Sequence, residues 1–108
     1  MFIKIQESDN ETEFLPMDSK LITDPSVINQ FQHLKKKLIL ENLYEIAKTI
    51  MQLSKDTKLN PGTVKRHLID LEEAGLIMLA KKEMSEKRIV KKFYRVTAKE
   101  FIIQYRWP

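Results

Sequence analysis

The segment from residue 49 to residue 75 constrains the fold of this chain more than any other part of its sequence. It contains the start and stop signals of two short helices. Thr49 and the glutamine three residues later have the spacing of a capping box, which predicts a first helix that ends near Thr57. Asn60 is a favoured N-cap and Pro61 suits the first helical position, while the glycine that closes the segment can end a helix. We therefore expect two helices joined by a tight turn.

The second helix, residues 61–74, has two chemically different sides. At about 100° per residue, Val64, Leu68 and Leu71 fall on one side, which is expected to pack. The other side combines a glycine in the first turn with basic side chains, and such donors suit phosphates and base edges. A solvated amphipathic helix is the alternative. The short helix that precedes residues 61–74 in the sequence favours the interpretation as a DNA-recognition helix. The residues expected to contact the major groove are Pro61, Gly62, Thr63, Lys65, Arg66 and Ile69.

The residues after this helix change to a pattern typical of strands. Residues 76–80 and 89–96 are rich in β-forming residues and predict a hairpin with a long tip. Along the second strand Val90, Tyr94 and Val96 are expected to pack, with a mostly basic face opposite. A hairpin directly after a recognition helix is a wing, whose tip would reach the flanking backbone or the minor groove; a solvated loop is the alternative. The basic residues of the expected tip are Lys81, Lys82, Lys87 and Arg88.

Helices are also expected before the capping box. Asp24 and Pro25 give a helix start, after which apolar residues recur at helical spacing as far as Ile46. This pattern predicts either two helices that meet near His33 or one bent helix. We interpret the lysines at 35–37 as a solvated face rather than as a binding patch or a nuclear localisation signal.

Two stretches of the chain read LNPGTVKRHLIDLEEAGLI and RIVKKFYRVTAKEF. They resemble the winged helix-turn-helix of the arsenic-repressor (ArsR) family, most closely its archaeal branch. The resemblance extends back through residues 22–25 and 33–43, so it covers roughly residues 22–101. One departure lies in the segment of the second helix, where such proteins often carry a His-Pro pair followed by Arg residues and this chain has His33-Leu34-Lys35-Lys36-Lys37.

A last helix is predicted from Ala98 to about Tyr105, because Thr97 and Glu100 form a second capping box. This segment carries more apolar surface than one core face needs, which indicates a partner. In the resembling family the first and last helices build the dimer interface. We therefore expect a two-fold homodimer that places two recognition helices about one turn of DNA apart. The expected interface residues are Val27, Ile28, Phe31, Phe101, Ile102, Tyr105 and Trp107.

Charge divides the chain into an acidic start and a basic body. Residues 1–25 hold two Lys against six Asp or Glu, whereas residues 55–95 hold eleven Lys or Arg against six, a net charge of +5. A basic body favours a polyanionic partner. We expect one structural domain of mainly α class with a small β-hairpin (α+β). It comprises an acidic N-terminal arm or hairpin (1–23), for which a frayed tail is the alternative, the winged helix-turn-helix (24–96) and a C-terminal dimerisation helix (97–108).

Several kinds of chemistry are not expected of this sequence. With no Cys it has no disulfide framework and no thiolate site, and the metal-binding Cys motif of the best-known members of the resembling family is missing. His33 and His67 lie far apart in the sequence, so we expect no metal and no cofactor. His67 is expected at the edge of the buried face. No phosphate-binding glycine loop, activated nucleophile or carboxylate pair suggests an enzyme. The start of the chain is unlike a signal peptide and no apolar run has the length of a membrane span, which predicts a cytoplasmic protein.

These features together favour one function and leave a second open. We expect a sequence-specific regulator of transcription that binds double-stranded DNA, with repression through blocked promoter access as the expected outcome. The alternative is a winged helix used as a protein-interaction module in a transcription or replication complex, because the fold alone does not decide function.

Overall fold

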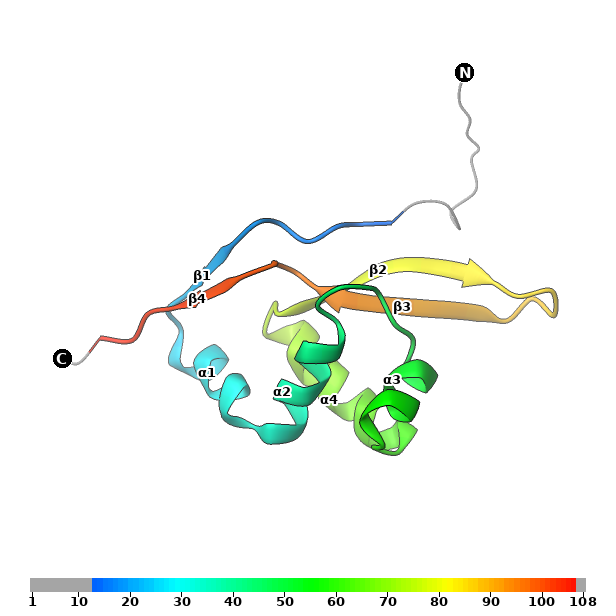
Figure 1. Cartoon of the computed structure of the whole chain (residues 1–108), viewed down its shortest axis with the longest axis horizontal. Coiled ribbons are helices and arrows are strands. Elements are labelled where there is room, and N and C mark those ends of the chain that lie inside the picture. Colours follow the sequence, from blue (N-terminus) through cyan, green and yellow to red (C-terminus); the bar gives the residue numbers. More distant parts are fainter. Residues whose placement is uncertain (1–12, 107–108) are drawn as a thin grey trace, which may run out of the picture.

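The computed structural model describes residues 13–106 of the 108-residue chain. Figure 1 shows the hairpin β2–β3 along one side of the helices, with its tip beyond α3 and with β1 and β4 at the opposite end of the molecule. Residues 1–12 of the expected N-terminal arm, and Trp107, lie outside the described residues. The elements are β1 (Lys20–Ile22), α1 (Pro25–Ile28), the 3₁₀ helix η2 (Asn29–Gln32), α2 (Leu34–Asn42), α3 (Ile50–Thr57), α4 (Pro61–Glu73), β2 (Ile77–Met84), β3 (Val90–Val96) and β4 (Phe101–Ile103).

The helical region before α3 is broken at His33, which confirms the first of the two alternatives. His33 is extended, with φ −84° and ψ 114°, so α2 starts anew after η2. Asp24 caps α1 by accepting a hydrogen bond of 2.9 Å from the Ser26 N–H. The break leaves Leu34 in solvent at 81% exposure, whereas Ile39 is fully buried.

The helix-turn-helix signals are confirmed at both helices. Thr49 and Gln52 form a capping box in which each side chain accepts a hydrogen bond from the other's backbone N–H, at 3.1 and 2.9 Å. At the end of α4, Gly75 has φ 77°, and the Leu76 N–H bonds back to the Leu71 carbonyl at 3.0 Å. These bonds form the left-handed cap that glycine adopts without strain.

The hairpin is confirmed, but its first strand is longer and its tip is shorter than predicted. β2 runs antiparallel to β3, and the register shifts between Leu79 and Lys81. The bulge lies in β2 and not in β3. Val96 is buried and Tyr94 packs against the core, as predicted. Phe93 is buried and Val90, at the end of the strand beside the tip, is 48% exposed, so the prediction is wrong for these two residues. Arg95, expected on the basic face, donates through Nη2 to the backbone carbonyls of the loop between α2 and α3.

The C-terminal helix predicted from Ala98 is wrong, because this segment forms the strand β4. The Thr97 hydroxyl, the predicted cap, donates instead to the Gly75 carbonyl at 2.8 Å, and the Glu100 carbonyl accepts from the Lys20 N–H. β4 pairs with β1 in parallel, with Lys20 opposite Phe101. The β-branched and aromatic residues of this segment suit a strand once a partner strand is present.

The described part of the N-terminal segment lies on its own subunit. The Phe14 N–H donates to the Ala80 carbonyl at 2.8 Å, and Met17 forms a parallel bridge with Ala98. Residues 13–22 thus run along the inner end of the hairpin and then along β4, and within them no hairpin forms.

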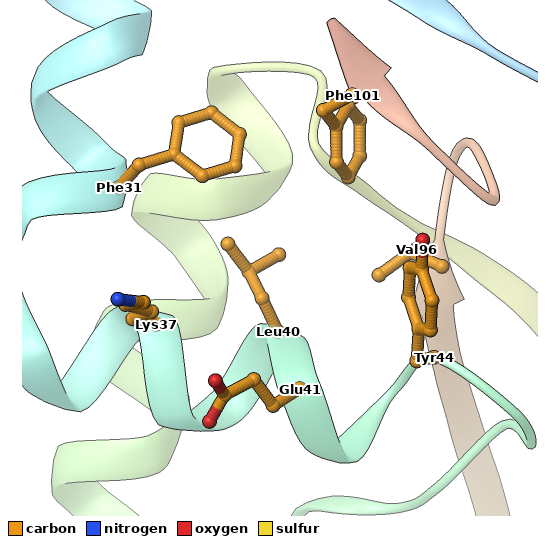
Figure 2. A pocket seen from close by; sticks show the side chains of 7 residues that line it. All are labelled: Phe31, Lys37, Leu40, Glu41, Tyr44, Val96 and Phe101. Carbon is orange, nitrogen blue, oxygen red and sulfur yellow. The ribbon is translucent and has the colours of Figure 1, made fainter. Parts of the chain in front are cut away.

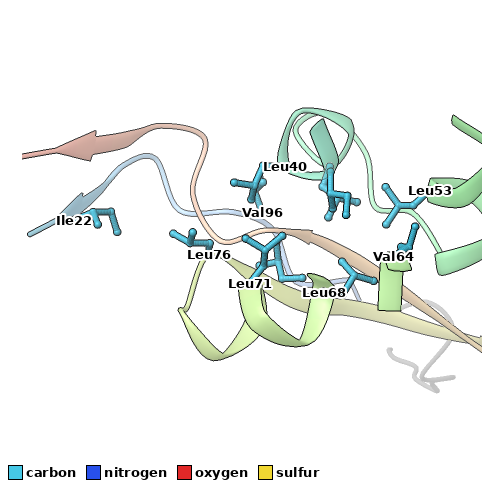
Figure 3. Packing of buried hydrophobic residues seen from close by; sticks show 11 residues of the cluster. Ile22, Leu40, Leu53, Val64, Leu68, Leu71, Leu76 and Val96 are labelled. Carbon is cyan, nitrogen blue, oxygen red and sulfur yellow. The ribbon is translucent and has the colours of Figure 1, made fainter. Parts of the chain in front are cut away.

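The hydrophobic core joins every layer of the fold. Figure 3 shows Leu40 of α2, Leu53 of α3, Leu68 of α4 and Val96 of β3 converging, with Ile22 of β1 at one end. Each such side chain contributes roughly 1.5–3 kcal/mol when buried. The terminal strands are therefore part of one packed unit with the helices. Within residues 13–106, no helix is both long enough and apolar enough to cross a membrane.

Candidate nucleic-acid interface

The solvent side of α4 carries the residues that the sequence assigns to the major groove. Of these, Pro61, Gly62, Lys65, Arg66 and Ile69 are exposed and Thr63 is half-buried. The opposite side of the helix, with Val64, Leu68 and Leu71, is buried as predicted. Contact of the exposed residues with DNA stays a prediction.

The first turn of α4 is capped by Asn60. The Asn60 side chain accepts from the Thr63 N–H at 2.8 Å and so satisfies one of the free N–H groups of this turn. A Cβ at Gly62 would have the Asn60 Oδ1 as its nearest neighbour, at 3.4 Å, an ordinary packing distance. The fold itself therefore has room for a methyl group at Gly62.

The turn between α3 and α4 achieves its geometry without a glycine. Lys58 takes the left-handed conformation, with φ 63° and ψ 19°, at a cost of roughly 1–2 kcal/mol for a residue with a Cβ. Ser54 compensates by donating its hydroxyl to the Leu59 carbonyl at 2.5 Å, and Leu59 packs against the core. The two helices are thus held at one angle by a satisfied turn.

The wing divides the four predicted basic residues between strand and tip. Lys87 and Arg88 lie in the tip, where Arg88 has φ 61° and its N–H donates to the Ser85 carbonyl. Lys81 and Lys82 belong to β2, so their predicted place in the tip is wrong. The extra residues of β2 result from the longer pairing between the strands.

Lys81 also differs from the others in its surroundings. Its ammonium lies 3.2 Å from Glu83, 3.7 Å from Glu13 and 4.8 Å from the centre of the Phe93 ring. The two carboxylates neutralise the positive charge of Lys81, so this side chain should attract a DNA phosphate only weakly. Lys82 instead faces Lys92 across the hairpin, and both are exposed. Lys92 escaped sequence analysis, because only the register of the hairpin places it beside Lys82.

The residues predicted for the dimer interface separate into two groups. Phe31 and Phe101 pack edge to face within one subunit, with ring centres 5.6 Å apart, and Val27 and Ile28 pack against the core. Figure 2 shows Phe31 and Phe101 on the wall of a mainly apolar hollow of about 350 Å³ between α2 and β4. Ile102 is 47% exposed, and Tyr105 beyond the strand is exposed as well.

The fold brings together the two histidines that are distant in the sequence. The ring centres of His33 and His67 lie 4.8 Å apart. Burial lowers the pKa of His67, and the positive charges of His33, Lys36 and Arg66 lower it further. Among the described residues, no group of three or more His, Cys, Asp or Glu side chains is placed to hold a metal ion.

Comparison with known proteins finds one family model that matches part of the chain and a set of similar folds. The profile described as "Bacterial regulatory protein, arsR family" matches residues 35–78, from the start of α2 into β2. A search of curated protein sequences finds no match.

Three solved structures have the same fold at low sequence identity. The winged helix-turn-helix DNA-binding domain of Mb0332 from Mycobacterium bovis, described as homodimeric and as a possible ArsR-family regulator, has a TM-score of 0.55 and 18% identity over 68% of this chain and 62% of that one. The transcriptional repressor BigR from Xylella fastidiosa has a TM-score of 0.54 and 20% identity over 66% and 64%. HlyU from Vibrio cholerae has 0.55 and 18% over 68% and 73%. The match spans less than two thirds of the first two proteins, and these likenesses establish the winged helix-turn-helix fold.

Proposed function

We propose that this chain, a DNA-binding transcription regulator of the arsR family, is a dimeric repressor that binds a palindromic operator and blocks access to a promoter. One observation carries the proposal. α4 is capped at both ends, packs one side into the core and presents small and basic residues on the other, next to a basic wing. We also propose that it acts in the cytoplasm and that it binds DNA without catalysing a reaction.

In this proposal α4 and the wing have different tasks. α4 enters the major groove, where Lys65 can donate to the base edges and Gly62 lets the backbone come close. The wing places Lys82, Lys87 and Arg88 against the flanking phosphates or in the minor groove. Base contacts supply sequence preference, whereas phosphate contacts supply affinity and position. Lys81 is left out of this surface because of its carboxylate neighbours.

The dimer is proposed to form through the end of the molecule that holds β1 and β4. On the outer face of this two-stranded sheet, Leu21 is 57% exposed beside Ile102, and Tyr105 follows β4 in the chain. A second copy that covers this face would remove its exposed apolar side chains from water and so stabilise both sheets. The homodimeric state described for the Mb0332 domain supports the same arrangement here. In this chain strands, and no C-terminal helix, would form the contact.

The test is the binding of labelled DNA duplexes at several salt concentrations. Each phosphate that a basic residue neutralises adds about 0.9 to the slope of log K against log[salt], so the full surface should give a slope of several units. A footprint on the protein's own promoter should show two protected half-sites about one helical turn apart. A properly folded protein with no affinity for any duplex would contradict the proposal and favour a protein-interaction module instead.

A further inference from the structure

A shallow hollow of about 470 Å³ lies where the start of α2 meets α4. Its walls are made by His33, Leu34, Lys35, Arg66 and His67, and none of these is a carboxylate. Arg66 also belongs to the exposed side of α4, so the hollow opens beside the surface proposed for DNA. Lys35, the first of three lysines that the sequence predicts to form a solvated face, thus lies beside α4.

The start of α2 differs from the starts of the other α-helices in residues 13–106. α1, α3 and α4 each have a side chain that accepts a backbone N–H of the first turn, from Asp24, Thr49 and Asn60. His33 occupies the same position at α2 but makes no such bond. The first-turn N–H groups of this nine-residue helix lack intrahelical partners and carry the positive end of its dipole. They suit an anion.

The histidine on the opposite wall has an unmet hydrogen-bonding need. His67 is only 7% exposed, and among the described residues its Nδ1 has no hydrogen-bond partner. Buried polar atoms are normally satisfied by a partner in the protein, by water or by a ligand. His33 lies against the same ring, so a negative charge in the hollow would face two imidazoles.

The charges around the hollow leave it positive. Lys36, the next lysine of α2, is bound to Asp70 at 3.1 Å and to Gln30 at 2.7 Å and is buried. Asp70 is thus paired, whereas Lys35 and Arg66 are exposed and make no ion pair within residues 13–106. A tetrahedral anion with several oxygens can use backbone donors, an ammonium and a guanidinium together.

We propose that this hollow binds one phosphate of the DNA backbone, held by the first-turn N–H groups of α2 and by the side chains of Lys35 and Arg66, with His67 as a further donor. The inference rests on the proposed DNA-binding function and adds a contact outside α4 and the wing. It assigns Arg66 to a phosphate rather than to a base edge. α2 then anchors the protein on the strand that flanks the groove occupied by α4.

The test compares Lys35→Gln with Lys37→Gln, two exposed lysines of the same helix that change the net charge equally. Lys37 lines the apolar hollow beside β4 and not the hollow at the start of α2 (Figure 2). Lys35→Gln should weaken binding to all duplexes on the order of tenfold and lower the salt slope by about one unit. Lys37→Gln should leave the slope unchanged. Circular dichroism checks that both variants fold.

A second arm locates the phosphate on the DNA. Methylphosphonates, which remove the charge of one phosphate at a time, should reveal a position whose neutralisation weakens the wild type but no longer affects Lys35→Gln. A third arm adds inorganic phosphate to the protein without DNA and follows the amide resonances of Leu34 and Lys35.

The outcomes separate the inference from the proposed function. A wild type that binds DNA with a steep salt slope, while Lys35→Gln and Lys37→Gln behave alike, overturns the inference alone. Shifts of these amides with inorganic phosphate, without any sensitive position in the methylphosphonate series, show a site for a free phosphate compound and also overturn it. A wild-type protein without affinity for DNA would contradict both the inference and the proposed function.

Discussion

The wing end and the terminal-strand end of this molecule expose opposite kinds of surface. The wing end carries exposed basic side chains at Lys82, Lys87 and Lys92, and the other end carries exposed apolar ones at Leu21 and Ile102. A cation stays well solvated until a phosphate replaces its water, whereas an apolar side chain leaves water only by meeting another apolar surface. The two ends therefore suit different partners. A substitution at one end should weaken DNA binding or dimerisation without changing the other.

The largest effect is expected from a charge on the outer face of β4. Ile102→Asp enters a two-fold interface twice, and each lost apolar contact is worth roughly 1.5–3 kcal/mol, so association should weaken on the order of a hundredfold or more. Sedimentation equilibrium measures this change. Ile46→Asp, at an exposed residue of the loop between α2 and α3, is the matched control and should not alter association. A dimer that survives Ile102→Asp would place the interface elsewhere.

A smaller effect is expected at the DNA end. Lys65→Ala should reduce affinity for the specific operator by about 1–3 kcal/mol, because it removes a contact to a base edge, and should leave dimerisation unchanged. Competition between specific and random duplexes is the measurement. Lys99→Ala, at an exposed lysine between β3 and β4, is the control. Equal losses for both variants would mean that Lys65 acts only through net charge.

Gly62→Ala sharpens the same comparison, because it changes the surface of α4 without removing a charge. A methyl group fits the fold, so stability should stay level or rise by up to about 1 kcal/mol, while DNA affinity falls if the backbone comes close. Urea unfolding and duplex titration measure the two quantities. Unchanged affinity would show that this turn stands away from the DNA.

Acidification should give the smallest effect, and it concerns the seam between α2 and α4. Burial and the nearby positive charges lower the pKa of His67, so the folded state takes up its proton less readily than the unfolded state does. The contribution of His67 to stability is therefore present above the ordinary value of about 6.5 and is lost as the pH falls below it. Thermal unfolding between pH 7.5 and 5.5 should show a smaller loss for His67→Gln than for the wild type. An equal loss would assign the effect to other groups.

The parts of the fold that the sequence predicted are those specified by neighbouring residues. The cap at Thr49, the cap at Asn60 and the closing Gly75 lie within four residues of the backbone groups they satisfy, so their spacing is readable in one dimension. The amphipathic division of α4 followed for the same reason. The winged helix-turn-helix fold and the resemblance to the arsR family, whose profile matches residues 35–78, were likewise predicted from this segment and the hairpin after it.

The errors have a common cause in contacts between distant residues. Thr97 has the spacing of a helix cap, yet its hydroxyl bonds to Gly75, and β4 pairs with a strand near the start of the described chain. The register of the hairpin, with its bulge after Leu79, places Lys82 opposite Lys92, and no local signal marks it. The meeting of His33 with His67 depends on how α2 packs against α4, and the hollow between them followed only from the structure.

The parallel pairing of β1 with β4 also sets an order of events during synthesis. Lys20 leaves the ribosome long before Phe101, its partner in the register, has been made. The contacts within α3 and α4 are local and form quickly, whereas β1 must wait for a closure that spans most of the domain. The helix-turn-helix should therefore fold before the sheet of β1 and β4 is complete. In the proposed dimer, the helices that would contact DNA would form before the surface through which two copies would pair, so pairing would have to follow the synthesis of β4.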